Sequence, residues 1–147
     1  MRAAGTKHFE ASREQVYRAA IEPERIARAA PGVQTVEQLD EKHWLVRIKI
    51  PLGLTSLKLA LRLELLEDRA PEHARLHGSG RGLGGSITFD TSFDLAEQDD
   101  GTDMRYEITV QLGGAVGSLG GRVLQPVFQL HVDNVLRTLD RELTAAQ

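Results

Sequence analysis

Hydrophobic and polar residues alternate with a period of two through most of the middle of the chain. The pattern is clearest in four stretches, at residues 44–50, 57–65, 87–95 and 104–112. Because successive side chains of a strand point to opposite faces, each stretch predicts a half-buried antiparallel strand with one dry face. Weaker stretches at 33–39 and 72–79 bring the expected run to about six strands, separated by polar turns.

Helical signals precede this run of strands. Ser12 stands three residues before Gln15, which is the spacing of a capping box and predicts a short helix over 13–20. Pro23 predicts the start of a second short helix, which ends at Pro31-Gly32. A weaker strand is expected before both helices, at residues 4–10.

The C-terminal part, from about residue 115 to 144, has helical spacing. Pro126 either kinks this helix or marks the start of its regular part. One face of the predicted helix carries apolar side chains, those of Leu124, Phe128, Val132, Val135, Leu139 and Leu143.

The order of elements predicts an α+β fold. A curved antiparallel sheet of about seven strands buries its dry face against the long C-terminal helix, and two short helices follow the first strand. The 147 residues fit one domain, spanning 1–147. A twisted sheet that curls around one helix encloses space that few side chains fill, so we expect a cavity between them.

Composition excludes several classes of protein. The formal net charge is −3, so the chain lacks the overall basic character of a nucleic-acid-binding protein. The absence of cysteine excludes disulfides, thiolate metal sites and a cysteine nucleophile. No run of about 18 apolar residues and no apolar leader segment occurs, so we expect a cytoplasmic protein without a membrane span.

Two glycine-rich runs stand out. The first, Gly78–Gly85, lacks the ending of a phosphate-binding loop, so we interpret it as a mobile hairpin connection that forms a flexible rim over a pocket. The second extends from Gly113 to Arg122 and favours close approach of the last helix to the sheet. An anion site aided by Arg122 is the alternative for this run.

The histidines and acids form no recognisable catalytic or metal-binding set, so the sequence predicts no catalytic residues, no metal and no cofactor. His73 and His77 share one face of a predicted strand but stand about 13 Å apart, too far to share a metal. His131 lies near the apolar face of the last helix. It is either a histidine at the edge of the core or a polar anchor for the head group of a ligand.

The chain resembles the CoxG family of carbon monoxide dehydrogenase subunits, within the Bet v 1/START-like (SRPBCC) superfamily of helix-grip domains. The matching motifs keep their order along nearly the whole chain. They are Gly5-x-x-x-Phe9, Ile26 to Gly32, Leu76-His77-Gly78-Ser79-Gly80, Gly84-Gly85-Ser86, Phe93-Asp94-Leu95, Asp100-Gly101-Thr102, Tyr106 and Gly113 to Gly120.

This resemblance implies a seven-stranded sheet gripping a long C-terminal helix around a lipophilic cavity. It also implies association with molybdenum-containing carbon monoxide dehydrogenases and related hydroxylases, in maturation, in membrane recruitment or as a quinone carrier. Longer members add a membrane-targeting tail after the last helix. Because the chain ends at Gln147, we expect peripheral membrane contact at most, without an anchor.

The preferred hypothesis is a carrier for a hydrophobic small molecule such as a lipid or a quinone, with Tyr106 and His131 supplying the polar contacts. One alternative is an enzyme of the polyketide cyclase or hydrolase type that uses Tyr106 or His131 as an acid or base. The other is an assembly or scaffold factor for a molybdenum hydroxylase. The residues expected to line the cavity are Trp44, Leu59, Leu61, Phe89, Phe93, Met104, Tyr106, Phe128 and His131.

Overall fold

The computed structural model describes residues 1–29, 32–51, 54 and 56–145. In chain order the elements are β1 (Arg2–Phe9), α1 (Arg13–Ile21), α2 (Pro23–Ala29), β2 (Val33–Asp40), β3 (His43–Pro51), β4 (Ser56–Arg69), β5 (His73–Leu83), β6 (Gly85–Gln98), β7 (Gly101–Gly113), α3 (Gly114–Gly117) and α4 (Gly121–Ala145). The predicted order of elements is therefore confirmed. The expected end of the second helix lies partly outside the described residues.

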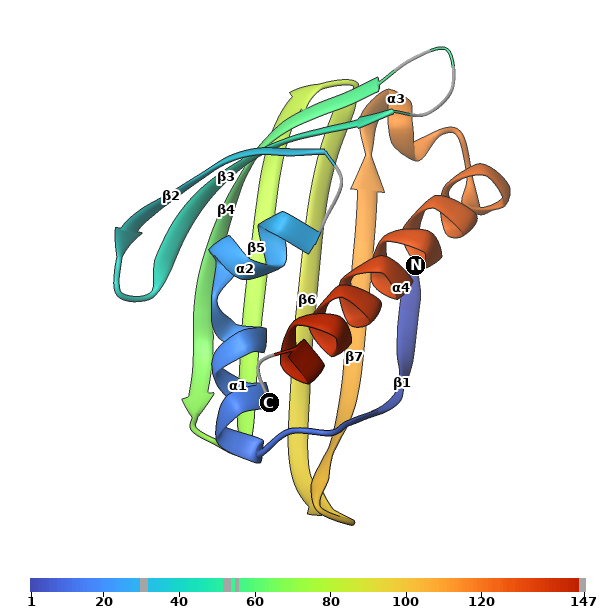
Figure 1. The fold of residues 1–147 in the computed structure, drawn as a ribbon. Coiled ribbons are helices and arrows are strands. Elements are labelled where there is room, and N and C mark those ends of the chain that lie inside the picture. The colour runs from blue at the N-terminus through green and yellow to red at the C-terminus, as the bar shows by residue number, and fades with distance from the viewer. Residues whose placement is uncertain (30–31, 52–53, 55, 146–147) are drawn as a thin grey trace.

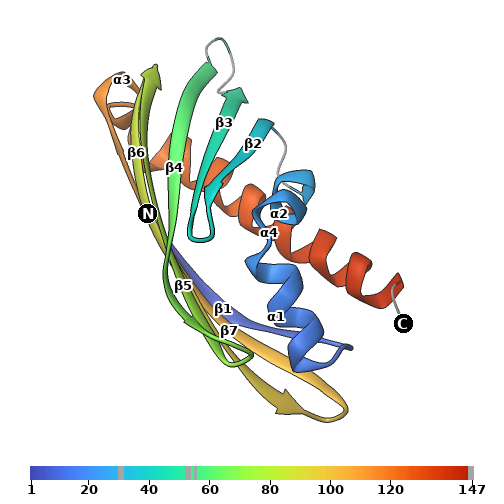
Figure 2. The same cartoon turned by 90° about the vertical axis from the view of Figure 1, so that its left-hand side faces the viewer.

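The seven strands form one antiparallel sheet in the order β1-β7-β6-β5-β4-β3-β2. Each strand from β2 to β7 pairs with the next one along the chain, whereas β1 pairs with β7. The helices α1 and α2 therefore carry the chain from one edge of the sheet to the other (Figure 1). The sheet curves, and the helices lie on its concave side (Figure 2).

Local signals explain where the helices begin. The Ser12 side chain accepts a hydrogen bond from the backbone N–H of Gln15, and the Gln15 side chain bonds back to the Ser12 backbone, which completes the predicted capping box. Pro126 lies inside α4, which begins at Gly121. No helix within the described part of the chain is long and apolar enough to cross a membrane.

The interior contains two hydrophobic clusters at opposite ends of the sheet. The lower cluster joins α1 and the end of α4 to the strands, through side chains such as Phe9, Val16 and Leu139. The upper cluster joins α3 and the start of α4 to β3 and β4, through Val116 and Leu124. The middle of the concave face lies between these two packed regions.

The interpretation of Gly78–Gly85 as a mobile connection is wrong for most of the run, because β5 continues to Leu83. A Cβ atom on Gly80 would collide with the carbonyl oxygen of Ala60 in the neighbouring strand β4. Glycine is therefore needed here for close approach of two strands. Only the turn that follows needs unusual backbone angles, with φ of 104° at Gly84 and 146° at Gly85.

Candidate ligand-binding cavity

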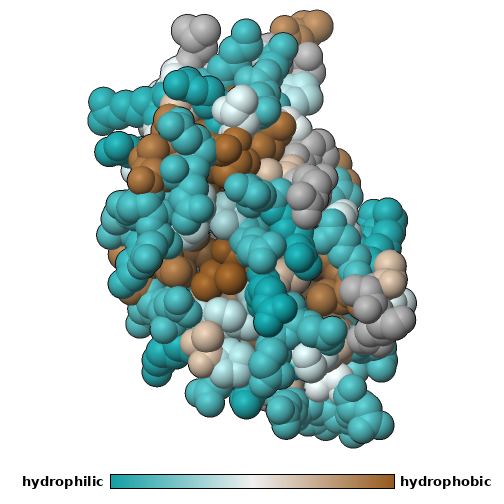
Figure 3. All heavy atoms as spheres, turned by 60° about the vertical axis from the view of Figure 1, so that its left-hand side comes forward, coloured by the Kyte–Doolittle hydropathy of each residue, from teal (hydrophilic) through white to brown (hydrophobic). Residues whose placement is uncertain are grey.

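A cavity of about 370 Å³ lies between the concave face of the sheet and the helices. Its walls come from the end of α1, from α2, from β3 to β7 and from the middle of α4. Figure 3 shows hydrophobic side chains in a recess bordered by hydrophilic ones on the side of the molecule facing the viewer. The volume falls within the range typical of sites for small molecules.

The cavity wall is almost wholly apolar. No Asp, Glu, Lys or Arg side chain belongs to the wall among the residues that the structure describes. Polar atoms come from only four lining residues, Thr91, Ser92, Tyr106 and His131. Since an unpaired charge is costly to bury, such a wall suits a molecule that is apolar and uncharged.

The structure places most of the predicted lining residues together. Those that line the cavity are Leu61, Phe89, Phe93, Met104, Tyr106, Phe128 and His131. They come from β4, β6, β7 and α4, which are distant in sequence and converge because the sheet curves around the helix. The alternation within each strand predicted their side of the sheet correctly.

Two predicted lining residues lie elsewhere. Leu59 packs in the upper cluster, near Val116 and Leu124, where α3 and the start of α4 cover the sheet. Trp44 is buried in the lower cluster and borders a second, separate depression beside Leu65. Both residues are on the dry face, but the strands extend beyond the cavity, so position along the strand decides which dry residues reach it.

Sequence reasoning missed the wall formed by the two short helices. Ala20 and Ile21 at the end of α1, and Pro23, Ile26 and Ala27 in and around α2, all line the cavity. We interpreted the charged residues of this segment as a solvated face, which is the opposite side of the same helices. The apolar pairs at 20–21 and 26–27 were the available signal.

His131 is the one histidine in the cavity wall among the described residues. Burial lowers the pKa of His131 below its ordinary value of 6.5. The imidazole is therefore neutral at neutral pH, with one nitrogen that donates and one that accepts a hydrogen bond. It can contact a polar group of a ligand without introducing a charge.

Tyr106 owes its position to a glycine. Gly5 of β1 lies directly opposite Tyr106 of β7, and a Cβ atom on Gly5 would come within 2.9 Å of the Tyr106 hydroxyl oxygen. The missing side chain lets the tyrosine ring lie over β1. The hydroxyl is thereby held at the edge of an apolar cavity, where it can donate a hydrogen bond.

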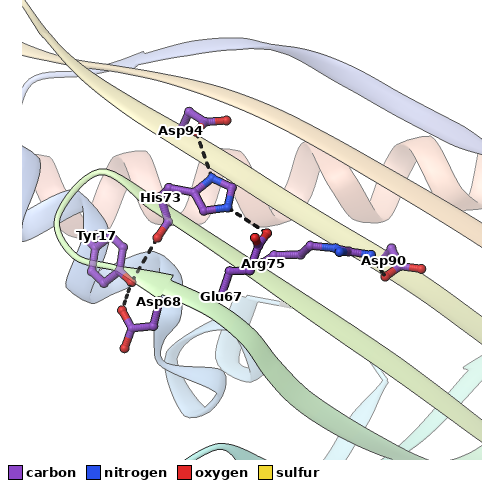
Figure 4. A network of polar contacts seen from close by, with 7 residues as sticks. All are labelled: Tyr17, Glu67, Asp68, His73, Arg75, Asp90 and Asp94. Atoms are coloured by element: carbon purple, nitrogen blue, oxygen red, sulfur yellow. Dashed lines mark hydrogen bonds and ion pairs between the residues drawn. The ribbon is translucent and has the colours of Figure 1, made fainter.

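A second group of polar residues lies outside the cavity (Figure 4). The Tyr17 hydroxyl donates to Asp68, and burial together with this carboxylate raises the pKa of Tyr17. Nearby, His73 contacts Asp94 at 2.8 Å through Nδ1 and Glu67 at 3.1 Å through Nε2. These contacts tie α1, β4, β5 and β6 together, so their role is structural.

The part of the chain that the structure describes contains no group of three His, Cys, Asp or Glu side chains that could hold a metal ion. The second glycine run follows the preferred interpretation in its packing. A Cβ on Gly117 would lie 2.6 Å from the Leu112 carbonyl oxygen, and the Val116 N–H bonds the Gly84 oxygen at 2.8 Å. These contacts hold α3 against β7 and the β5–β6 turn.

Comparison with solved structures shows the fold. A conserved protein from Geobacillus kaustophilus superimposes with a TM-score of 0.90 at 20% identity, covering 99% of this chain and 97% of the other. A START superfamily protein from Mycobacterium smegmatis gives 0.74 at 10% identity, covering 99% of each chain. The protein Ara h 8.0201 gives 0.66 at 12% identity, covering 99% of this chain and 98% of the other.

The curated proteins contain no match to this sequence. Residues 5–144, which include all but the ends of the chain, match the family described as CoxG, a carbon monoxide dehydrogenase subunit. The architecture agrees with the helix-grip fold that the family resemblance implied. The protein therefore belongs to the CoxG family of carbon monoxide dehydrogenase subunits, within the Bet v 1/START-like superfamily.

Proposed function

We propose that this protein is an accessory carrier that holds an uncharged, hydrophobic small molecule in the cavity between the sheet and α4. A quinone is the class of ligand that we favour. The observation that carries the proposal is the apolar wall of about 370 Å³, which the described residues leave without any carboxylate, ammonium or guanidinium group. A cavity of about 150 Å³ already suffices to bind benzene in another protein.

The wall argues against an anionic ligand. A fatty-acid carboxylate inside this cavity would have no cationic partner among the described lining residues, because His131 is neutral at neutral pH. Burying an unpaired carboxylate is strongly unfavourable. A quinone carries no charge, and its ring fits a wall of aliphatic and aromatic side chains such as those of Phe89 and Phe93.

Two polar groups are suited to orient such a ring. The Tyr106 hydroxyl and an imidazole N–H of His131 can each donate a hydrogen bond to a carbonyl oxygen. Both belong to the cavity wall, on β7 and α4 respectively. Hydrogen bonds of this kind add a modest affinity and a definite orientation to binding that apolar contact dominates.

Membership of the family suggests the setting in which the carrier works. We propose that it serves a molybdenum-containing carbon monoxide dehydrogenase or a related hydroxylase, for which a quinone is a chemically suitable electron acceptor. Co-purification of such an enzyme with the protein tests this association. An association that survives filling of the cavity would instead favour the scaffold role.

The first experiment is native mass spectrometry of the purified protein, followed by solvent extraction of any bound molecule. A second experiment displaces the fluorescent probe Nile red with menaquinone-1 or with palmitate at neutral pH. The proposal expects the quinone to compete and palmitate to fail. Failure of both probe and quinone to bind would overturn the carrier proposal.

Two variants test the anchors in the same assay. Tyr106→Phe and His131→Gln should each weaken quinone binding by about two- to tenfold, the range expected for one hydrogen bond. Tyr17→Phe and His77→Gln are matched controls, because they make the same chemical changes outside the cavity wall. Equal effects of the test and control variants would remove Tyr106 and His131 from the binding model.

A further inference from the structure

The charges of this acidic chain are distributed unevenly. Residues 42–63 and 73–89 contain no Asp or Glu, although the whole chain has 21 of them. The two segments form β3, the first part of β4 and β5, which are neighbours in the sheet. They carry five exposed cations, Arg47, Lys49, Lys58, Arg62 and Arg81, which we call the basic patch.

The register of the strands brings the basic patch together. Lys49 pairs directly with Lys58, and Ala60 stands between Arg47 on one side and Arg81 on the other. Both lysines alternate along their strands with buried residues of the dry face, so they lie on the outer face. The five cations therefore share one convex surface over three adjacent strands.

The fold itself gains nothing from this arrangement. Like charges directly opposite each other on neighbouring strands are destabilising. Among the ion pairs formed by the described residues, none includes a member of the basic patch. Contact with an anionic partner would remove the repulsion between Lys49 and Lys58, so the patch is suited to binding such a partner.

An exposed leucine indicates which kind of anionic partner fits. Leu54 lies between the ends of β3 and β4, at the upper edge of the sheet in Figure 1, and its side chain is fully exposed. An apolar side chain beside a cluster of cations is typical of proteins that bind anionic membranes. Binding to single-stranded nucleic acid generally uses aromatic side chains, and no Phe, Tyr or Trp occurs in residues 45–88.

We propose that the basic patch docks this protein on an anionic lipid bilayer, with Leu54 entering the interfacial layer and the five cations facing lipid phosphates. The proposal goes beyond the carrier function and does not depend on it, because an empty protein has the same surface. It concerns the face of the domain itself. The same cations and Leu54 should therefore determine both affinity and salt dependence.

Flotation with vesicles tests the proposal. The protein should bind phosphatidylcholine vesicles that contain about 30 mol% phosphatidylglycerol and should not bind pure phosphatidylcholine. Raising the salt to about 0.5 M should release it, because ions screen surface charges. Lys49→Gln with Lys58→Gln should lower the partition coefficient about 25-fold, at about fivefold for each neutralised cation. Leu54→Ser should lower it about tenfold.

Each variant has a matched control. Arg18→Gln with Arg141→Gln removes two exposed charges from the helices, and Leu39→Ser removes a leucine that is 43% exposed at the end of β2. Neither control should change vesicle binding. The lysine double variant should also be at least as stable as the wild type, because it removes the repulsion between Lys49 and Lys58.

Two results would overturn the proposal. One is equal loss of vesicle binding in the test and control variants, which would make the effect one of net charge alone. The other is binding to DNA or heparin as tight as binding to the vesicles and unchanged by Leu54→Ser, which would assign the patch to a soluble polyanion. Nile red uptake, measured in parallel, separates this outcome from failure of the carrier proposal.

Discussion

Gly78 offers a test of the way in which the sheet shapes the cavity. Gly78 is buried in β5, directly opposite Phe89 in β6, and Phe89 lines the cavity. A Cβ atom on Gly78 would overlap the Phe89 ring and lie 2.9 Å from a methyl carbon of Leu63. We therefore expect Gly78→Ala to displace the ring into the cavity.

The expected magnitude follows from the cost of overpacking. Inserting a methyl group into a packed interior costs about 1–3 kcal/mol. For a domain of this size each kcal/mol lowers the melting temperature by about 2–4 °C. A ligand that must push the ring back would bear a similar cost, and about 1.4 kcal/mol corresponds to a tenfold loss of affinity. We thus expect a lower melting temperature together with weaker binding.

Thermal unfolding and Nile red titration measure the two effects. Gly121→Ala is the control, because no atom lies within 4 Å of a Cβ at that position and alanine favours the start of α4. Adding Phe89→Leu to Gly78→Ala should restore part of the lost affinity by removing the displaced ring. If Gly78→Ala binds Nile red as tightly as the wild type, the reasoning about Phe89 is refuted.

Three further predictions concern stability. Thr102→Val should lower the free energy of unfolding in urea by about 1–3 kcal/mol, because the buried hydroxyl donates to the Ala11 carbonyl at 2.8 Å; an unchanged value would contradict this. Ser12→Ala should cost about 1 kcal/mol through loss of the α1 cap, and Ser12→Asp should largely restore it; equal losses in both variants would contradict the capping role. The Glu67 and Asp94 contacts raise the pKa of His73 above 6.5, so its charged form stabilises the fold below that pH, and this stabilisation is lost as pH rises through the raised pKa. Between about pH 6 and pH 8, His73→Gln should therefore lose less stability than the wild type, whereas an identical pH dependence would contradict it.

The sequence predicted much of the fold because the relevant signals are local. Alternation such as that from Leu57 to Leu65 reports which side of a strand is dry, whatever the strand pairs with. The capping box at Ser12 acts within one turn of helix and was predicted correctly. The glycine run at 78–85 was misinterpreted because glycine serves both flexible turns and close strand contacts. Only the neighbouring strand distinguishes these two uses.

The candidate site required more than local pattern. Leu59 and Leu61 are equivalent in the sequence, two residues apart on one dry face, yet Leu61 lines the cavity and Leu59 packs against the upper cluster. The difference arises because α3 and the start of α4 cover one end of the sheet and leave its middle open. No periodicity within β4 contains that information.

By itself, the sequence determined the order of the elements, the dry face of each strand and the family resemblance. The tertiary structure decided which dry residues surround the cavity, since curvature and helix placement depend on contacts between distant segments. It also decided that cations from β3, β4 and β5 share one surface, because strand register sets which side chains become neighbours. Patterns of period two and 3.6 are properties of one segment, whereas a cavity or a charged surface is a property of several segments packed together.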